Sequence, residues 1–296
     1  MAREPILPRL TKFGCLIALV GLAYCCSEAL AADKPQVRWL VIDFPPFHIV
    51  SGPDRGKGMR DRYLDALRAR LPNFDSRVEV SDTTRQVALM QAGQPVCSIS
   101  MLRTPEREQF MLFSEQPYGL QLPVRLVMAS QSAAALGPVV DDQGVDLARV
   151  LAGGMIRLGV LPKRRFGASI DRVIADAAVH YPNTVQVFNA NGSLEGLLDL
   201  IGKGRIEATL GYGLEVEQLR QHNAKLGDFA FLPITQAPDL VPTYVACSRN
   251  PVGAKVIAEI NALGFNDAAT RQLRADYEAL LPTSERKEFE HALAGK

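Results

Sequence analysis

The sequence lacks the residue patterns on which metal, nucleotide and hydrolase chemistry usually depend. Its four histidines show no metal-ligand spacing, and no Cys-x-x-Cys pair occurs. There is no G-x-S-x-G segment, and Gly56-Lys57-Gly58 has neither the glycine pattern of a dinucleotide loop nor the Lys-Ser/Thr pair of a P-loop. These absences argue against a bound metal, cofactor or nucleotide, and we expect the protein not to be an enzyme.

An excess of charge of one sign is also missing. The 296 residues carry a formal net charge of +1, with 22% charged residues. Nucleic acids and anionic membrane surfaces attract strongly basic proteins, so neither is an expected partner. After residue 32, no apolar run approaches the roughly 20 residues that a membrane-spanning helix needs. We expect a monomer whose ligand is a small molecule.

The first residues are typical of a secretory signal peptide. Three basic residues among the first 12 precede the apolar run 13–24, and the small residues of Ala29-Leu30-Ala31 follow. This order matches the basic, apolar and cleavage regions of an exported precursor. We expect residues 1–31 to be removed by cleavage after Ala31 and the mature protein to lie in the periplasm. A retained membrane anchor is the alternative.

Only two cysteines, Cys97 and Cys247, remain after such a cleavage. An even pair in an oxidising compartment favours a disulfide bond. Two buried free thiols are the alternative, because Cys also packs as a small apolar residue.

Short apolar strands alternate with amphipathic helices along the mature chain, which predicts an α/β protein with parallel sheets. We expect a buried strand over Val37–Ile42 and a strand over Gln121–Met128, followed by a polar break at residues 130–144. The pattern then repeats, and a strand over Tyr244–Ser248 precedes three C-terminal helices. A chain that leaves one lobe, builds another and returns needs two adjacent linkers, which act as a hinge.

Several loop motifs occur in a specific order. Phe44-Pro45-Pro46-Phe47 follows the first strand, Thr104-Pro105-Glu106-Arg107 comes later, and Phe113–Tyr118 (FSEQPY) follows it. Gly204-Arg205-Ile206-Glu207-Ala208 is a fourth element. In these motifs and their order the sequence resembles family 3 of the bacterial extracellular solute-binding proteins, the periplasmic amino-acid receptors of ABC transporters. The resemblance spans nearly the whole mature chain.

The resemblance implies a two-lobed periplasmic binding protein fold of type II. Each lobe would be a central, mostly parallel sheet flanked by helices, and two strands would form the hinge. We expect a discontinuous first lobe of residues 32–127 and 244–296, and a second lobe of residues 128–243.

The implied function is capture of a small polar solute for an ABC-type transporter, with an inner-membrane permease as partner. A sensory binding protein that acts on a signalling partner and a dehydratase-like enzyme on the same fold are the alternatives.

Arg107 is the first candidate for ligand binding, because a planar guanidinium matches the two oxygens of a carboxylate. Ser100 and the backbone N–H groups near Leu102 and Thr104, at an expected helix start, would add donors to the same anion. The alternative for Arg107 is a structural ion pair with a carboxylate close by, namely Glu106, Glu108 or Asp61.

Aromatic and second-lobe residues complete the candidate site. Phe44 is expected to stack on the ligand, as the matching aromatic does in the family, and Phe47 to lie in the core. Arg164 and Arg165 stand where the resemblance places small hydroxyl residues, which favours an anionic solute unless they form a solvated basic turn. Tyr212 replaces the family's ammonium-binding Asp, and Leu102 stands where many relatives have a hydroxyl residue. The resemblance therefore does not imply an α-amino acid as ligand.

Overall fold

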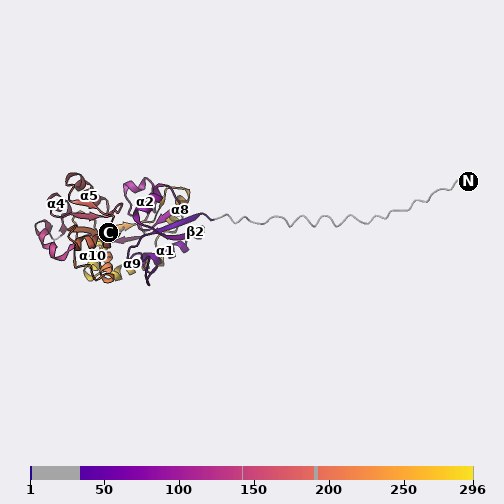
Figure 1. Ribbon diagram of the computed structural model, residues 1–296. Helices are drawn as coiled ribbons and strands as arrows, with labels where there is room; N and C mark the ends of the chain where they lie inside the picture. The colour runs from indigo at the N-terminus through magenta and orange to yellow at the C-terminus, as the bar shows by residue number, and fades with distance from the viewer. Residues whose placement is uncertain (2–33, 142, 190–192, 296) are drawn as a thin grey trace. The chain divides into compact units, whose positions relative to one another are not determined.

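The computed structural model describes residues 34–141, 143–189 and 193–295, together with Met1. The predicted signal peptide, its cleavage after Ala31 and the cysteines within it lie outside the described residues. Residues Pro35–Lys296 form one compact unit, whose helices and strands are shown in Figure 1. Within the described ranges, no helix has the length and apolar character needed to cross a bilayer.

The first sheet contains five strands in the order β2-β1-β3-β14-β4. Strands β2 and β3 run parallel to β1, whereas β14 is antiparallel to both β3 and β4. The bounds of these strands are β1 Gln36–Val41, β2 Asp75–Val80, β3 Val96–Ser98, β4 Met111–Phe113 and β14 Ala246–Ser248. A strand from the last part of the chain is therefore built into the sheet formed by the first part.

The helices that pack around this sheet begin at well-defined caps. Their bounds are α1 Met59–Ala69, α2 Thr83–Gln91, α3 Pro105–Glu108 and α8 Pro251–Leu263. The side chains of Asp82, Thr104 and Asn250 each accept a hydrogen bond from a backbone N–H in the first turn of α2, α3 and α8, respectively. Pro105 stands in the first turn of α3, where its missing N–H costs nothing. The caps fix where the loops between strands and helices end.

The second sheet also has five strands, in the order β10-β9-β11-β6-β12. Strands β10, β9 and β11 are parallel, and β6 runs antiparallel to β11 and β12. The strand bounds are β6 Arg125–Ala129, β9 Leu158–Val160, β10 Val185–Val187, β11 Ala208–Gly211 and β12 Phe229–Leu232. The helix bounds are α4 Leu147–Ala152, α5 Ala168–His180, α6 Leu194–Gly202 and α7 Gly213–His222. A 3-10 segment, Ser130–Val139, and a short hairpin of β7 Val140–Asp141 and β8 Gly144–Val145 connect β6 to α4.

Two short antiparallel strands connect the two sheets. The chain leaves the first sheet through β5 (Gly119–Gln121) and returns through β13 (Val241–Thr243), which pairs with β5. The predicted hinge of two adjacent strands is thus present, and both sheets are flanked by helices. Each sheet has two parallel and two antiparallel pairings, because β14 and β6 run against their neighbours.

The strand predicted over Gln121–Met128 is in fact two strands with different roles. Gln121 ends β5 of the hinge, and β6 begins at Arg125 in the second sheet. Pro123, which has no N–H to donate to a ladder, lies in the break between them. Residues 125–127, which we assigned to the first lobe, therefore pair in the second sheet, and the remaining lobe boundaries stay predictions.

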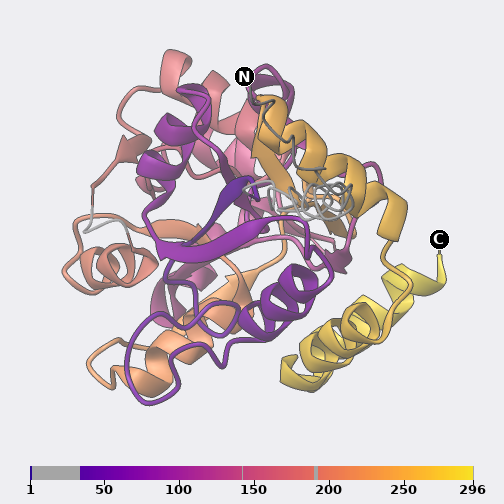
Figure 2. The ribbon, with the colours of Figure 1, turned by 90° about the vertical axis from the view of Figure 1, so that its right-hand side faces the viewer.

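The two C-terminal helices, α9 (Ala268–Leu280) and α10 (Thr283–Ala294), pack beside the hinge. Helix α9 lies against α1, as Figure 2 shows with α9 in yellow and α1 in purple. Tyr277 of α9 accepts a hydrogen bond from the backbone N–H of Leu122, 2.9 Å away, just after β5. Glu288 of α10 forms an ion pair with Arg125 of β6. The C-terminal helices therefore contact both the first lobe and the first strand of the second sheet.

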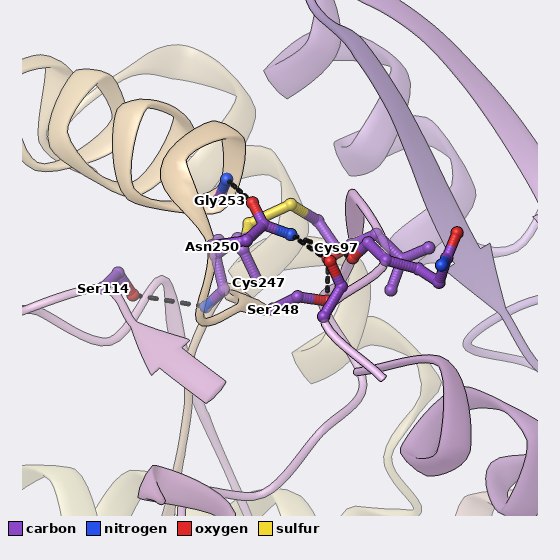
Figure 3. The surroundings of a disulfide bond; sticks show 10 residues. Cys97, Ser114, Cys247, Ser248, Asn250 and Gly253 are labelled. Atoms are coloured by element: carbon purple, nitrogen blue, oxygen red, sulfur yellow. Dashed lines mark hydrogen bonds between the residues drawn. A yellow bond between two sulfur atoms is a disulfide. The ribbon is translucent and has the colours of Figure 1, made fainter. Parts of the chain in front are cut away.

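Cys97 and Cys247 form a disulfide bond between the adjacent strands β3 and β14 (Figure 3). The two cysteines are separated by 150 positions in the sequence, and the whole second sheet lies between them. Beside it, Asn250 accepts from the N–H of Gly253 and donates to the carbonyls of Gly93 and Gln94. The predicted disulfide is confirmed, and the alternative of two free thiols is excluded.

Candidate ligand-binding site

A cavity of about 280 Å³ lies between the two lobes. Its walls come from the loops after β1 and β3, from hinge residues Gln121 and Thr243, and from the loops after β9 and β11. All the residues that we predicted to bind ligand line this one cavity: Phe44, Ser100, Leu102, Arg107, Arg164, Arg165 and Tyr212. The fold therefore brings the candidate residues of both lobes together, and their contact with a ligand stays a prediction.

The two phenylalanines of the Phe-Pro-Pro-Phe loop have different positions. Backbone hydrogen bonds in both directions between Phe44 and His48 close the loop. The two rings stack with centroids 4.5 Å apart, yet Phe44 lines the cavity, whereas Phe47 is only 1% exposed and packs against Tyr277. Of the two phenylalanines, Phe44 is therefore the one that reaches the cavity.

His48 connects Ser100 to the carboxylate of Asp61. The Nδ1 atom of His48 lies 2.6 Å from Oδ1 of Asp61, and its Nε2 atom lies 3.0 Å from Oγ of Ser100. Burial opposes the charge of Asp61, but hydrogen bonds from His48, Ile49 and Gly58 outweigh it and hold the pKa of this carboxyl below its ordinary value. The carboxylate thus stays charged and accepts the proton that His48 carries on Nδ1.

The proton on Nδ1 decides how Ser100 faces the cavity. Complete burial lowers the pKa of His48, against the opposing effect of Asp61, and keeps the ring neutral. The Nε2 atom of a neutral ring with its proton on Nδ1 is an acceptor, so the Ser100 hydroxyl donates to it. Ser100 then offers only lone pairs to a solute. We had expected Ser100 to donate to an anion, and the neutral ring of His48 reverses that role.

Arg107 is a buried cation without a carboxylate partner among the described residues. Its side chain is 5% exposed and donates to the carbonyls of Leu102, at 2.9 Å, and Lys163, at 3.1 Å. Burial, aided by the nearby charge of Arg165, lowers its pKa to about 10, so it remains charged at neutral pH. Its direct partners are neutral carbonyls, and the charges of Asp171 and Glu106 favour its charged form only from beyond ion-pair distance.

The structural ion pair that we considered for Arg107 does not form. Glu106 pairs with Arg165, Glu108 with Arg103, and Asp61 with His48. Leu102 contributes its carbonyl to Arg107 and a half-buried side chain to the wall of the cavity. Arg107 is therefore held in place by the backbone, with its charge directed to the cavity that it lines.

The charges of Arg164 and Arg165 are neutralised by the protein itself. Arg164 donates to both oxygens of Glu215, at 3.2 and 2.7 Å. Burial opposes its charge, but the attraction and hydrogen bonds of Glu215 outweigh burial and raise the pKa of Arg164. Arg165 pairs with Glu106 of the first lobe. Both residues line the cavity, but the pair adds no free positive charge there and so gives no separate support for an anionic solute. The alternative of a solvated basic turn does not describe Arg164 either, because its side chain is only 17% exposed.

Tyr212 is part of an aromatic contact between the lobes. It stands at the start of α7, and its ring centroid lies 5.9 Å from that of Phe44 and 6.0 Å from that of Phe47. Burial raises the pKa of its phenol, so it stays neutral. Together with the Arg107 to Lys163 and Arg165 to Glu106 contacts, it joins the loops of the two lobes around the cavity.

Sequence reasoning missed several residues of the site. Arg60, Gln121 and Glu215 line the cavity, and His48 and Asp61 set the orientation of Ser100. Arg60 precedes Tyr63, Leu64 and Leu67 by three, four and seven residues, so helical spacing places it on the apolar face of the predicted helix. That position is a signal for a buried cation, and we overlooked it. Glu215 opens α7 three residues after Tyr212, and only the fold reveals that Arg164 lies opposite.

No protein family model matches the chain, and no curated protein matches it in sequence. Solved structures do match in fold. An ancestral arginine-binding protein bound to arginine has a TM-score of 0.56 at 16% identity, over 83% of this chain and 96% of that one. A putative L-cystine ABC transporter protein from Listeria monocytogenes has a TM-score of 0.57 at 14% identity, over 83% and 95%.

A third match is a histidine kinase sensor domain with similarity to periplasmic binding proteins, with a TM-score of 0.56 at 11% identity, over 84% of this chain and 94% of that one. Each of the three matches includes more than four fifths of this chain and more than nine tenths of the matched structure. The chain therefore has the two-lobed α/β fold of the periplasmic amino-acid-binding proteins.

Proposed function

We propose that this protein captures a small carboxylate-bearing solute in the cavity between its lobes and delivers it to an ABC-type transporter. The observation that carries the proposal is Arg107, a residue only 5% exposed that lines the cavity and whose guanidinium, among the described residues, donates to backbone carbonyls and forms no ion pair. An uncompensated buried ion costs on the order of several kcal/mol, and a solute carboxylate would relieve that cost. Phe44 would cover the apolar part of the solute, and Ser100 would accept a hydrogen bond from it.

The comparisons support a solute of this kind. One structural neighbour is described as bound to arginine, and another as a cystine transporter protein. Both named solutes carry a carboxylate. Because Tyr212 brings a neutral phenol where the family has an ammonium-binding Asp, we do not restrict the solute to α-amino acids.

Transport implies export and a membrane partner. We propose that residues 1–31 direct the chain to the periplasm and are removed near Ala31, and that an inner-membrane permease recognises the closed lobes. Solute binding would stabilise the closed state and so raise the fraction of protein that the partner accepts.

A sensory role is the second candidate, because one structural neighbour is a histidine kinase sensor domain. The protein would bind its solute in the same cavity and close in the same way, and the closed form would then act on a signalling partner. Genes for a permease and an ATPase beside this one would favour transport, whereas a lone gene or an adjacent kinase gene would favour sensing.

We propose that the site binds without catalysis. Asp61, His48 and Ser100 have the contact order of a Ser-His-Asp triad. A base in such a triad must also pass its proton to a leaving group, and His48 is completely buried behind Ser100. Orientation of the Ser100 hydroxyl is the role that this geometry supports.

A thermal-shift screen with carboxylates, amino acids and polyamines tests the proposed function. A solute present at a hundredfold excess over its Kd stabilises the protein by about 2.7 kcal/mol, which is roughly 5–10 °C in Tm at this size. We expect Arg107→Met to abolish the shift given by carboxylates. Arg77→Met, which changes an exposed arginine of β2, is the matched control and should leave it unchanged. A full shift in a folded Arg107→Met protein contradicts the assignment.

A further inference from the structure

Arg60 is a second buried cation at the cavity. It stands in the first turn of α1, is 5% exposed, and lines the same cavity as Arg107. Its guanidinium donates to the amide oxygen of Gln121 and lies 4.6 Å from the ring centroid of Phe47 and 5.9 Å from that of Phe44. Each of these partners is neutral. Nothing in the proposed function so far uses this charge.

The carboxylates near Arg60 are engaged elsewhere or are open to water. Asp61 holds His48 and two backbone N–H groups, and Glu215 holds Arg164. Asp43 and Asp82 also line the cavity, but both are exposed, so that solvent screens their charge. Across the described ranges, no carboxylate lies within ion-pair distance of Arg60 or of Arg107.

The neutral partners of Arg60 stabilise its charge by less than burial of that charge costs. A cation over an aromatic ring gains about 0.5–2 kcal/mol, whereas burial of an ion costs on the order of several kcal/mol. The charge of Arg60 also acts on its surroundings, since it lowers the pKa of His48 and opposes the rise that burial gives to the pKa of Tyr118. The cavity therefore has two buried guanidinium groups that, within the described part of the chain, form no ion pair, and separate elements hold them.

We propose that the solute is a dianion with one carboxylate at Arg107 and a second anionic group at Arg60. This inference rests on the proposed function and narrows it to dicarboxylates and acids of equivalent charge. A solute with one negative charge would leave one of the two buried guanidinium groups uncompensated. A solute with two would compensate both, and charge-assisted hydrogen bonds to a planar guanidinium are the strongest that the site offers.

Isosteric pairs of probes separate the two anion sites. Succinate and succinamate, glutarate and glutaramate, and L-glutamate and L-glutamine differ by one carboxylate replaced with a neutral amide of the same shape. Titration calorimetry with the purified protein should give tighter binding of the member with two carboxylates, by about tenfold to a hundredfold. Arg60→Met should remove this preference and leave the Kd of the amide member unchanged within about threefold. Arg107→Met should weaken both members.

Two further variants control for structural damage. Arg62→Met changes an arginine of the same helix that pairs with Asp276 and lies outside the cavity, and it should keep the preference. Arg60→Lys keeps the positive charge and should keep part of the preference for the member with two carboxylates. Equal affinity of the unmodified protein for both members of every pair, or equal weakening of both by Arg60→Met, overturns the second anion site while the proposed function stands. If no probe binds, the proposed function is contradicted as well.

Discussion

At the scale of single residues, the site depends on which polar groups have a partner inside the protein. Four arginines line the cavity, and two of them are neutralised by Glu215 and Glu106. The other two, Arg60 and Arg107, contact neutral groups. Ser100 likewise acts toward a solute as an acceptor, because its O–H already donates a hydrogen bond to Nε2 of His48. A solute is thus selected by the groups that the protein leaves uncompensated.

His48 should make the stability of the protein depend on pH. Its folded pKa lies below the ordinary value of 6.5, mainly because the ring is buried, so the unfolded chain binds more protons in the interval between the two values. Stability is therefore fully present above pH 6.5 and falls as the pH decreases through that interval. Urea unfolding at a series of pH values from 7.5 downward should show this loss.

The matched variants are His48→Gln and His222→Gln. The first removes the buried titrating group and should flatten this part of the pH profile, at some cost in stability at neutral pH. The second changes an exposed histidine and should preserve the profile. A profile of the same slope in His48→Gln would show that other groups cause the dependence.

At the scale of elements, the start of α8 joins a helix cap to the loop before β3. Asn250 caps the N–H of Gly253 at 2.7 Å and donates to the carbonyls of Gly93 and Gln94, at 2.9 and 3.1 Å (Figure 3). One side chain therefore fixes the beginning of α8 against the edge of the first lobe, beside the disulfide.

Replacement of Asn250 should destabilise the first lobe without touching the cavity. We expect Asn250→Ala to cost about 1–2 kcal/mol, because it removes a cap and two further hydrogen bonds. Asn250→Asp keeps the acceptor of the cap and loses the two donors, so that it should retain part of the stability. The midpoint of urea unfolding measures both, and unchanged carboxylate binding is the control. No loss of stability in Asn250→Ala would show that water replaces these bonds.

At the scale of the whole molecule, the disulfide encloses the entire second sheet. The chain leaves the first sheet through β5, builds the second and returns through β13 to β14, where Cys247 meets Cys97. The bridge thus constrains the unfolded chain over a long loop, and Cys247 follows the end of β13 by only a few residues.

Removal of the disulfide should lower the free energy of unfolding by up to about 5 kcal/mol, the loop-closure entropy for a loop of this length. Cys97→Ser combined with Cys247→Ser should unfold at lower denaturant concentration than the parent protein. A reducing agent should shift the parent toward the variant and leave the variant unchanged. Equal midpoints for both proteins without reductant would mean that strain or residual structure cancels the entropic gain.

Local patterns by themselves determined much of this protein. Apolar periodicity located β1, α1 and most later elements, and the even pair of cysteines predicted the bridge that is observed. The loop motifs pointed to Phe44 and Arg107, and the expected helix start near Thr104 pointed to Ser100; all three line the cavity. These features depend on residues close together in the chain, or on residue chemistry alone, and the sequence displays both.

The tertiary structure alone decided which charges are free. Sequence analysis offered Arg107 three carboxylate partners and named none for Arg164 and Arg165. In the fold, Arg107 donates to backbone carbonyls. Arg164 and Arg165 form ion pairs with Glu215 and Glu106. The fold also split the strand predicted over Gln121–Met128 at Pro123 and buried Arg60 against Phe47. The physical reason is that ion pairing and burial depend on distances between residues far apart in the chain, and the packing of two lobes around a hinge sets those distances.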